Sequence, residues 1–276
     1  MEGYILIVFY HHPCSDGMCC AHLINLCYAD VTYVPCGNLR VVPKDEVIYN
    51  QDVLVLDYSF SKETLVKMAS IAKSVTVLDH HASASYIEEL LADGIIEGEF
   101  DIRKSGARLT LDWLRNQGYE IDLWDRALVD YIEDYDLWKF ALPNSKEVNA
   151  TIQSYPMDLE SWKHMPNVDA LVAEGKAILR YKESLIKEHL DQVFMGNLDG
   201  VGVPTVVCTS KTLISELGNR MAQNNPYAVI KKPLLNGTEY SLRSSESGED
   251  VSEIAKRFGG GGHKHAAGFV VLNTKE

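Results

Sequence analysis

Short apolar runs alternate with longer stretches of helical periodicity through the first third of the chain. The apolar runs predict strands near residues 4–10, 31–35, 52–57 and 74–79. The intervening stretches predict helices near 18–29, 61–72 and 83–92, followed by two more near 105–117 and 123–135. Because strands that alternate with helices form a parallel sheet covered on both faces, the pattern predicts an α/β domain.

The second half of the chain follows a different pattern. Three prolines and scattered polar residues in 143–167 predict a long connection, and a charged amphipathic helix is expected from about 168 to 195. Beyond it, strands are expected near 201–208, 227–235, 238–243 and 266–272, with helices near 213–223 and 250–258. We therefore expect a first domain, a connecting helix or linker and a second domain, at residues 1–165, 166–196 and 197–276.

The composition is that of a globular protein, with 276 residues of which 46% are hydrophobic. No apolar stretch reaches the length of about 18 residues that a transmembrane helix needs, and the first apolar run lacks the basic segment of a signal peptide. The six cysteines show no framework spacing, which is typical of a reducing compartment. The sequence therefore predicts a cytoplasmic protein.

The net charge of −13 bears on the class of substrate. Proteins that bind long nucleic acids usually present a basic stripe, because phosphate neutralisation dominates their affinity. The sequence contains no Lys/Arg-rich run. Since the overall field would repel an extended polyanion, the charge favours small phosphorylated substrates over long duplex nucleic acid.

Metal-capable side chains gather where predicted strands and one helix end. They are His12 and Asp16 after the first strand, Asp57 after the third, Asp79, His80 and His81 after the fourth, and Asp134 and Asp136 at the end of the helix near 123–135. Because the carboxyl ends of parallel strands meet at one edge of a sheet, we expect these side chains to converge. Their oxygen and imidazole ligands suit Mn²⁺, Fe²⁺, Co²⁺ or Zn²⁺ better than Ca²⁺.

Each of these groups has an ordinary alternative explanation. Asp57 could cap the helix that begins near residue 61, and the two carboxylates near residue 135 could form a solvated face. His11 and His12 could be polar loop residues, a description that fits His11 better than His12. Convergence of four groups at one sheet edge favours a metal centre over these separate explanations.

The same residues resemble the motifs of the DHH superfamily of phosphoesterases, which is named for a triplet that matches Asp79-His80-His81. His12-x-x-x-Asp16-Gly17 resembles the first motif of that superfamily and Asp57 the second. The fourth motif corresponds to Asp134 or Asp136, and the sequence leaves open which of the two.

The C-terminal run FGGGGHKHAAGF, at residues 258–269, is similar to the signature of the DHHA1 domain. That domain forms the second lobe of RecJ-type exonucleases, of the nano-RNase/pAp-phosphatase group and of related cyclic-dinucleotide phosphodiesterases. The resemblance extends from about residue 4 to about residue 272. It implies an α/β protein in which a parallel-sheet DHH domain with helices on both faces precedes a smaller α/β DHHA1 domain.

The resemblance also implies a set of metal ligands, namely His12, Asp16, Asp57, Asp79, His80, Asp134 and Asp136. In this scheme Asp57 bridges two ions, His12 and Asp16 complete one site, and His80 with Asp134 completes the other. The implied cofactor is Mn²⁺, as one or two ions, with Mg²⁺ or Co²⁺ as substitutes.

Two residues of the triplet have implied catalytic roles. Asp79 would be a ligand or would orient an imidazole. His81 would face the substrate phosphate, as a hydrogen-bond donor or as the proton donor to the leaving group.

One position departs from the family pattern. Many members carry a second Asp two residues after the Asp of the first motif, where this chain has Met18. Others carry an acidic residue two positions before that Asp, where this chain has Cys14. The second metal site could then be weaker, could recruit Asp136 or Cys14, or could fill only with substrate bound.

The resemblance further implies substrate contacts outside the metal centre. Glycine runs let a backbone approach a ligand closely and bind anions through N–H groups, and a guanidinium can bind phosphate through two hydrogen bonds. The implied substrate-binding residues are Arg103, Arg243, Gly260, Gly261, Gly262 and His263. A flexible hinge is the ordinary alternative for the glycine run, and an exposed strand residue is the alternative for Arg243.

We therefore predict a Mn²⁺-dependent phosphoesterase that cleaves short oligonucleotides or small nucleotides with a metal-activated water. A cyclic-dinucleotide phosphodiesterase, a single-strand-specific exonuclease and a nucleotide-binding protein with weakened catalysis remain alternatives. No membrane partner is expected, and a homodimer is among the oligomeric states that the sequence leaves open.

Overall fold

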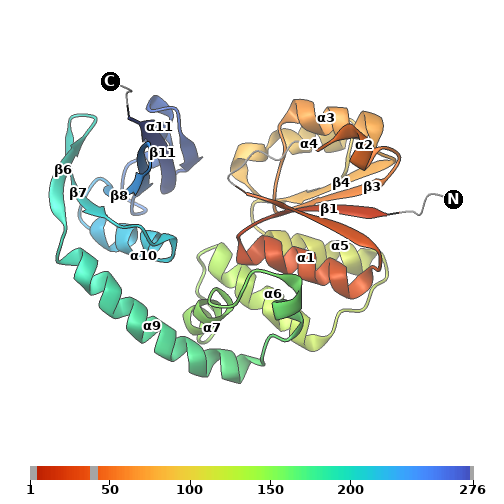
Figure 1. Ribbon diagram of the computed structural model, residues 1–276, viewed down its shortest axis with the longest axis horizontal. Coiled ribbons are helices and arrows are strands. Elements are labelled where there is room, and N and C mark those ends of the chain that lie inside the picture. The colour runs from red at the N-terminus through yellow and green to blue at the C-terminus, as the bar shows by residue number, and fades with distance from the viewer. Residues whose placement is uncertain (1–4, 38–42, 274–276) are drawn as a thin grey trace. The chain divides into compact units, whose positions relative to one another are not determined.

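The computed structural model describes residues 5–37 and 43–273. The chain divides into two compact units, Met1–Leu179 and Arg180–Glu276, which are called unit 1 and unit 2 below (Figure 1). The division falls inside the longest helix. Each unit is built around its own sheet, so the two are described separately.

Unit 1 is built on a five-stranded sheet in which every neighbouring pair of strands is parallel. Its strands are β1 (Leu6–His11), β2 (Val31–Cys36), β3 (Asp52–Leu56), β4 (Ser74–Asp79) and β5 (Glu97–Phe100), in the order β2-β1-β3-β4-β5. Because all strands point the same way, their carboxyl ends form one edge. Four of the strands match the prediction, and β5 was not predicted.

Helices cover both faces of this sheet, which confirms the predicted fold class. On one face α1 (Ser15–Cys27), α5 (Gly106–Asn116) and α6 (Leu123–Asp136) pack against Val8 and Leu54, and on the other α3 (Lys62–Ile71) and α4 (Tyr86–Ala92) pack against Ile7 and Val53. Successive strand residues point to opposite faces, so strands buried on both faces are almost continuously apolar. A short helix, α2 (Asp45–Ile48), and a 3₁₀ turn at Ala82–Ala84 complete this part of the unit.

The stretch 143–167 is not a bare connection, contrary to the prediction. It contains two short helices, α7 (Ser145–Ile152) and α8 (Leu159–Lys163), which bury Val148, Ile152 and Trp162 in the core of unit 1. Helices this short present too few apolar positions for a helical period to be visible in the sequence. The following helix, α9 (Val168–Leu190), buries Leu171 in unit 1 and Ile186 in unit 2.

Unit 2 is built on a six-stranded mixed sheet. Its strands are β6 (Phe194–Leu198), β7 (Val201–Val207), β8 (Ala228–Leu234), β9 (Gly237–Arg243), β10 (Gly261–His263) and β11 (Ala266–Leu272), in the order β10-β11-β9-β8-β7-β6. The pair β7–β8 is parallel and the other pairs are antiparallel. Helix α10 (Lys211–Met221) packs on the face of Ile230, and α11 (Val251–Arg257) packs on the opposite face with Val229.

Two strands of unit 2, β6 and β10, were not predicted. Both lie at edges of the sheet, where exposed strands lack a clear apolar alternation. Within residues 5–37 and 43–273, no helix is long and apolar enough to cross a membrane.

Candidate metal centre

The carboxyl edge of the unit 1 sheet brings together the imidazole and carboxylate residues that follow its strands. Two groups of three side chains have ligand atoms within 4.8 Å of one another. One group is His11, Asp57 and His81, and the other is Asp16, Asp57 and His80. Asp57 belongs to both groups, so the two groups form one continuous cluster.

Asp57 is the centre of this cluster. Its Oδ2 lies 3.2 Å from Nδ1 of His11, and its Oδ1 lies 3.2 Å from Nε2 of His80 and 3.9 Å from Nδ1 of His81. The residue is 1% exposed and has a φ of +51°. A left-handed backbone is uncommon for a residue other than glycine, and such strain concentrates at functional sites.

Asp16 is held by the beginning of α5. Its Oδ2 accepts a hydrogen bond from the N–H of Gly106 at 2.7 Å, and its Oδ1 accepts one from the N–H of Ala107 at 2.8 Å. Unpaired N–H groups at a helix N-terminus stabilise a carboxylate there. A side chain at Gly106 would approach Cβ of Asp57 to 2.5 Å, so glycine is what permits this approach.

Asp79 positions His81. Its Oδ1 lies 2.7 Å from Nδ1 of His81 and also accepts the backbone N–H of His80 at 2.8 Å. Its Oδ2 accepts the hydroxyl of Ser59 at 2.5 Å, and Asp79 is fully buried. Asp79 therefore takes the place of the imidazole-orienting residue, one of the two roles that the family resemblance implied for it.

Burial and like charges dominate the electrostatics of the cluster. Burial and the neighbouring carboxylates of Asp57 and Asp136 hold the pKa of Asp16 well above its ordinary value. Partial burial and the charge of Asp57 raise the pKa of Asp136 to about 6. Several carboxylates thus compete for few positive charges in a small volume.

The histidines offset part of this negative charge. Burial alone would lower the pKa of His80, but its hydrogen bond with Asp57 and the charges of Asp136, Asp57 and Asp16 raise that pKa to about 9. Burial would also raise the pKa of Asp57, yet its hydrogen bonds with His11 and His80 lower it. The pKa of His81 is raised in the same way by Asp79, against the effect of burial.

The donor set fits a divalent transition-metal ion. Imidazole nitrogens and carboxylate oxygens in combination suit Mn²⁺, Fe²⁺, Co²⁺ or Zn²⁺. Burial and mutual repulsion favour the protonated form of these carboxylates. A bound cation would favour their ionised form instead. Asp57 is common to both groups, and either group offers three ligand atoms to an ion.

The structure distinguishes between the two carboxylates at the end of α6. Oδ2 of Asp136 lies 3.6 Å from Nε2 of His80, and its side chain is 29% exposed. Asp134 is instead directed away, and its two oxygens accept the N–H groups of Ala141 and Leu142 at 2.8 and 3.3 Å. Asp136 is therefore the one that joins the cluster, whereas Asp134 fixes the loop after the helix.

The first motif is arranged differently from the expected ligand set. His11, which we had considered the more ordinary loop residue, lies beside Asp57. Nε2 of His12 lies 3.0 Å from the backbone carbonyl of Met157. His11 is the last residue of β1 and is paired with Cys36, the last residue of β2. The strand register therefore places His11 at the carboxyl edge of the sheet.

Met18 lies fully buried in the apolar core of unit 1. The position where many relatives carry a second Asp therefore faces hydrophobic side chains. Cys14 lies close enough to the cluster that burial, together with the charges of Asp57, Asp16 and Asp136, raises the pKa of its thiol well above the ordinary value. Of Cys14 and Asp136, Asp136 is the one whose carboxylate lies 3.6 Å from Nε2 of His80.

In unit 2, Arg243 at the end of β9 is half-buried. Its guanidinium donates to the carbonyl of Leu242 at 2.9 Å and to the hydroxyl of Ser215 at 3.3 Å. Burial lowers its pKa, and no carboxylate within residues 5–37 and 43–273 pairs with it. A guanidinium without a protein counter-ion is a natural site for an anion.

The glycine run forms a tight edge hairpin. Gly261 and Gly262 belong to β10, and His263 is paired with Ala266 across the turn to β11. A side chain at Gly260 would approach the carbonyl oxygen of Gly268 to 2.1 Å, whereas space beside Gly261 is open. Residues Gly261–His263 therefore form a short strand that is paired with β11.

Arg103 is placed at the carboxyl edge of unit 1, but it already has a partner. It follows β5, its side chain is 85% exposed, and its guanidinium pairs with both carboxylate oxygens of Asp101 at 2.8 and 2.9 Å. No contact joins it to the residues of the metal cluster among those that the structure describes.

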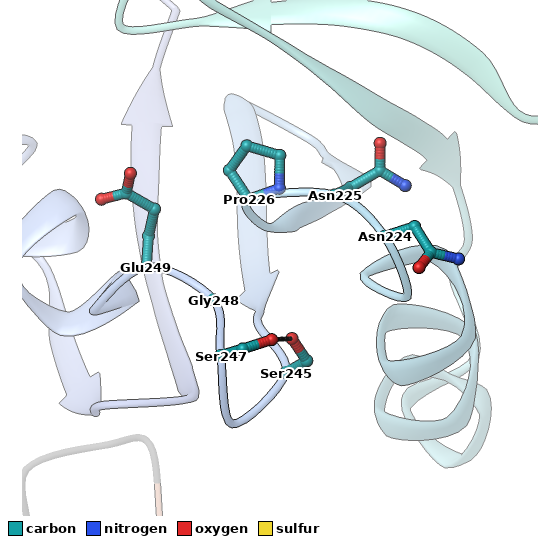
Figure 2. Close-up of a pocket in the computed structure, with 7 residues that line it drawn as sticks. All are labelled: Asn224, Asn225, Pro226, Ser245, Ser247, Gly248 and Glu249. Carbon is teal, nitrogen blue, oxygen red and sulfur yellow. Dashed lines mark hydrogen bonds between the residues drawn. The ribbon is translucent and has the colours of Figure 1, made fainter.

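A separate pocket of about 480 Å³ lies in unit 2 (Figure 2). It is lined by Asn224, Asn225, Pro226, Ser245, Ser247, Gly248 and Glu249. The hydroxyls of Ser245 and Ser247 face each other, and Glu249 gives the pocket a carboxylate. With an acidic group and no basic one in its lining, this pocket is a poor site for phosphate.

The sequence gives weaker signals for the supports of the cluster than for its candidate ligands, although Ser105-Gly106-Ala107 resembles family positions near the active site. Gly106 and Ala107 act through backbone N–H groups. Every residue except proline has such a group, so the residue type does not indicate this role. A serine followed by a glycine at the beginning of a predicted helix was the available signal, because Ser105 is the N-cap of α5. Ser59, which donates to Asp79, gave no such signal.

No family model matches the chain, but two curated proteins align with nearly all of it. The uncharacterized protein R106 of Acanthamoeba polyphaga mimivirus is 26% identical over 298 residues, which cover 98% of this chain and 68% of the viral protein. The oligoribonuclease NrnB of Bacillus subtilis (strain 168) is 24% identical over 297 residues, which cover 96% of this chain and 72% of NrnB.

Among solved structures, the pGpG-specific phosphodiesterase PggH from Vibrio cholerae is similar in fold, with a TM-score of 0.51 and 14% sequence identity. The match covers 98% of this chain and 94% of PggH. With its ordered motifs, its two-unit α/β fold and these similarities, the chain is a relative of the DHH/DHHA1 phosphoesterases.

Proposed function

We propose that this protein is a metal-dependent phosphodiesterase that hydrolyses short oligonucleotides or small nucleotides. The observation that carries the proposal is the buried cluster at the carboxyl edge of unit 1, in which Asp57 is shared by two imidazole–carboxylate groups. The similarity to an oligoribonuclease over almost the whole chain supports a nucleotide substrate. Mn²⁺ is the proposed ion, because the mixed nitrogen and oxygen donors suit it.

The proposed ligands are Asp16, Asp57 and His80 for one ion, and His11, Asp57 and His81 for a second. Asp136 is proposed to complete the first group, since it lies beside His80. A divalent ion would neutralise phosphate charge and acidify a water molecule enough for attack near neutral pH. His12 and Asp134 are left with structural roles in this proposal.

The chain's own residues would hold the centre rigid. The two N–H groups that α5 donates to Asp16 fix the orientation of that carboxylate, and Asp79 fixes the ring of His81. Nδ1 of His81 lies 2.7 Å from Oδ1 of Asp79, and Nε2 is the ring atom that we propose acts on an ion or on the substrate. We infer that His81 either binds the second ion or donates a proton to the leaving oxygen, and these two roles exclude each other at the same nitrogen.

Unit 2 is proposed to bind the substrate's phosphates. Arg243 supports this because its guanidinium has no carboxylate partner among the described residues. The open space beside Gly261 would let a ligand approach the backbone of β10 closely, with His263 on the same short strand. Arg103 is a weaker candidate, because a substrate would have to displace Asp101.

A diribonucleotide is the substrate that we propose, because the charge of unit 1 disfavours a long polyanion. Arg180–Glu276 carries 12 Lys and Arg residues against 11 Asp and Glu residues, whereas the whole chain carries 26 against 39. All of the excess negative charge therefore lies in unit 1, where it would disfavour a long polyanion. The similarity in fold to a pGpG-specific phosphodiesterase is compatible with this choice.

The test is hydrolysis by the full chain with added Mn²⁺ across a panel of phosphate esters. The panel holds pAp, RNA and DNA of two to five nucleotides, a longer single strand, linear and cyclic dinucleotides, and pyrophosphate. We expect rapid release of mononucleotides from the shortest oligomers and slow release from the long strand. Preference for a cyclic dinucleotide would favour the cyclic-dinucleotide alternative, and no turnover with metal bound would refute the proposed activity.

A further inference from the structure

An aromatic cluster joins the last turn of α6 to the loop that follows this helix. It consists of Tyr135, Trp138 and Phe140, whose ring centroids lie 5.7, 5.7 and 4.7 Å apart in edge-to-face arrangements. Trp138 nevertheless remains 45% exposed. The two other rings thus support an indole that presents part of its surface to solvent.

The backbone of this loop is held in an unfavourable conformation. Trp138 and Phe140 have φ values of +56° and +49°, in the left-handed region that bulky residues rarely adopt. Asp134 compensates by accepting four N–H groups, two at its carbonyl from Lys139 and Phe140 and two at its carboxylate from Ala141 and Leu142. Strained conformations that the surroundings enforce are concentrated at functional sites.

The loop begins next to the metal cluster. Oδ2 of Asp136 lies 3.6 Å from Nε2 of His80. Trp138 follows Asp136 by two residues, so the Cα atoms of Asp136 and Trp138 are no more than about 7 Å apart. Within the cluster, the side chains of Asp16 and Asp57 are buried, whereas those of His11, His81 and Asp136 are 29–35% exposed. A ligand must therefore reach the cluster from the side of the exposed residues, and Asp136 leads directly to Trp138.

We propose that Trp138 is a substrate-binding residue that stacks on a nucleobase, while the phosphate of the same nucleotide lies at the metal cluster. The inference rests on the proposed nucleotide phosphodiesterase function. Every base has a π-face, so stacking on an aromatic ring tolerates different base identities and adds affinity without reading sequence. Tyr135 and Phe140 preorganise the indole, which reduces the entropy lost when the base binds.

The test compares Trp138→Ala and Trp138→Phe with the wild type. Tyr49→Ala is the matched control, because Tyr49 is a 70% exposed aromatic residue that precedes β3, at the opposite end of this strand from Asp57. The substrates are a diribonucleotide and two derivatives in which either one or the other base is absent. Binding of a non-hydrolysable diribonucleotide analogue with Mn²⁺ is measured by calorimetry in parallel.

We expect Trp138→Ala to raise the KM for the diribonucleotide and the Kd of the analogue by about 5- to 100-fold. Trp138→Phe should recover most of that loss. Removing the stacked base should abolish the difference between Trp138→Ala and wild type, and Tyr49→Ala should match wild type on every substrate.

Equal losses on all three substrates would mean that Trp138 only stabilises the loop, and an unchanged KM and Kd in Trp138→Ala would also overturn the inference. Failure of the proposed function gives a different result. In that case the wild-type protein turns over no substrate, while the calorimetric comparison of wild type with Trp138→Ala still decides whether the indole binds the base.

Discussion

The two units of this protein hold their candidate functional residues in opposite electrostatic settings. Unit 1 concentrates buried carboxylates around Asp57 and carries all of the excess negative charge of the chain. Unit 2 is close to neutral and exposes backbone at Gly261 beside a strand that ends in Arg243. The first setting favours a cation, and the second is the one in which we propose that phosphate binds.

The two settings also differ in how they are built. The acidic cluster depends on side chains from four strands and helices, held by backbone groups of α5 and by Asp79. The glycine hairpin depends on the near absence of side chains, because Gly260 and Gly268 lie in contact. Substitutions should therefore separate metal binding in unit 1 from phosphate binding in unit 2.

The largest effect is expected for Asp57→Asn, which removes the charge shared by both groups while keeping the side-chain volume. We expect turnover to fall by about 10³-fold or more, since metal-assisted stabilisation is worth several kcal/mol. The rise in melting temperature that Mn²⁺ gives the wild type should also disappear.

Asp45→Asn is the control for Asp57→Asn, because Asp45 is an exposed carboxylate that pairs with Lys67. It should retain both turnover and the response to Mn²⁺. A normal Mn²⁺ response in Asp57→Asn would contradict the assignment of this cluster as the metal centre.

The next effect distinguishes Asp136 from Asp134. Asp136→Asn should lower turnover by about 10- to 100-fold and weaken the response of the melting temperature to Mn²⁺, because it removes a charge beside His80. Asp134→Asn should retain that response but lower the free energy of unfolding by about 1–2 kcal/mol, since one buried N–H loses its acceptor. The reverse pattern would make Asp134 the motif-four ligand.

A smaller effect is expected for Arg243→Ala in unit 2. Loss of charge-assisted hydrogen bonds to phosphate should raise the KM at least about 10-fold, and Arg243→Lys should restore part of it. The Mn²⁺-induced rise in melting temperature should persist, because the proposed ion lies in unit 1. Arg220→Ala, which breaks the exposed pair with Glu183, is the control and should leave the KM unchanged.

The smallest effect on turnover is expected for the glycine run, where stability is the better readout. Gly260→Ala should lower the free energy of unfolding by about 3 kcal/mol, because its Cβ would meet the carbonyl oxygen of Gly268. Gly261→Ala has open space and should be neutral in stability. If Gly261→Ala also leaves the KM unchanged, this face of the hairpin does not contact the substrate.

Much of the fold could be predicted from the sequence, because buried parallel strands are nearly continuous apolar runs. The central strands β1, β3 and β4 are of this kind, and they were predicted together with the helices that cover them. The strands that escaped prediction, β5, β6 and β10, are short edge strands with mixed or glycine-rich sequences. Their position is decided by a neighbouring strand that the sequence does not identify.

What the sequence by itself determined is which chemical groups gather at one sheet edge. The position of Asp57 and Asp79-His80-His81 at strand ends follows from apolar runs and from the parallel direction of the strands. The family resemblance follows from the same residues and their order.

The tertiary structure alone decided which of two neighbouring residues lies close to Asp57 and His80. His11 rather than His12, and Asp136 rather than Asp134, lie beside the cluster, because strand register and helix phase set the direction of each side chain. The left-handed backbone of Asp57 and the N–H groups that Gly106 and Ala107 direct at Asp16 come from segments far apart in the sequence. Such contacts depend on distances of a few ångström, which packing determines and residue order does not.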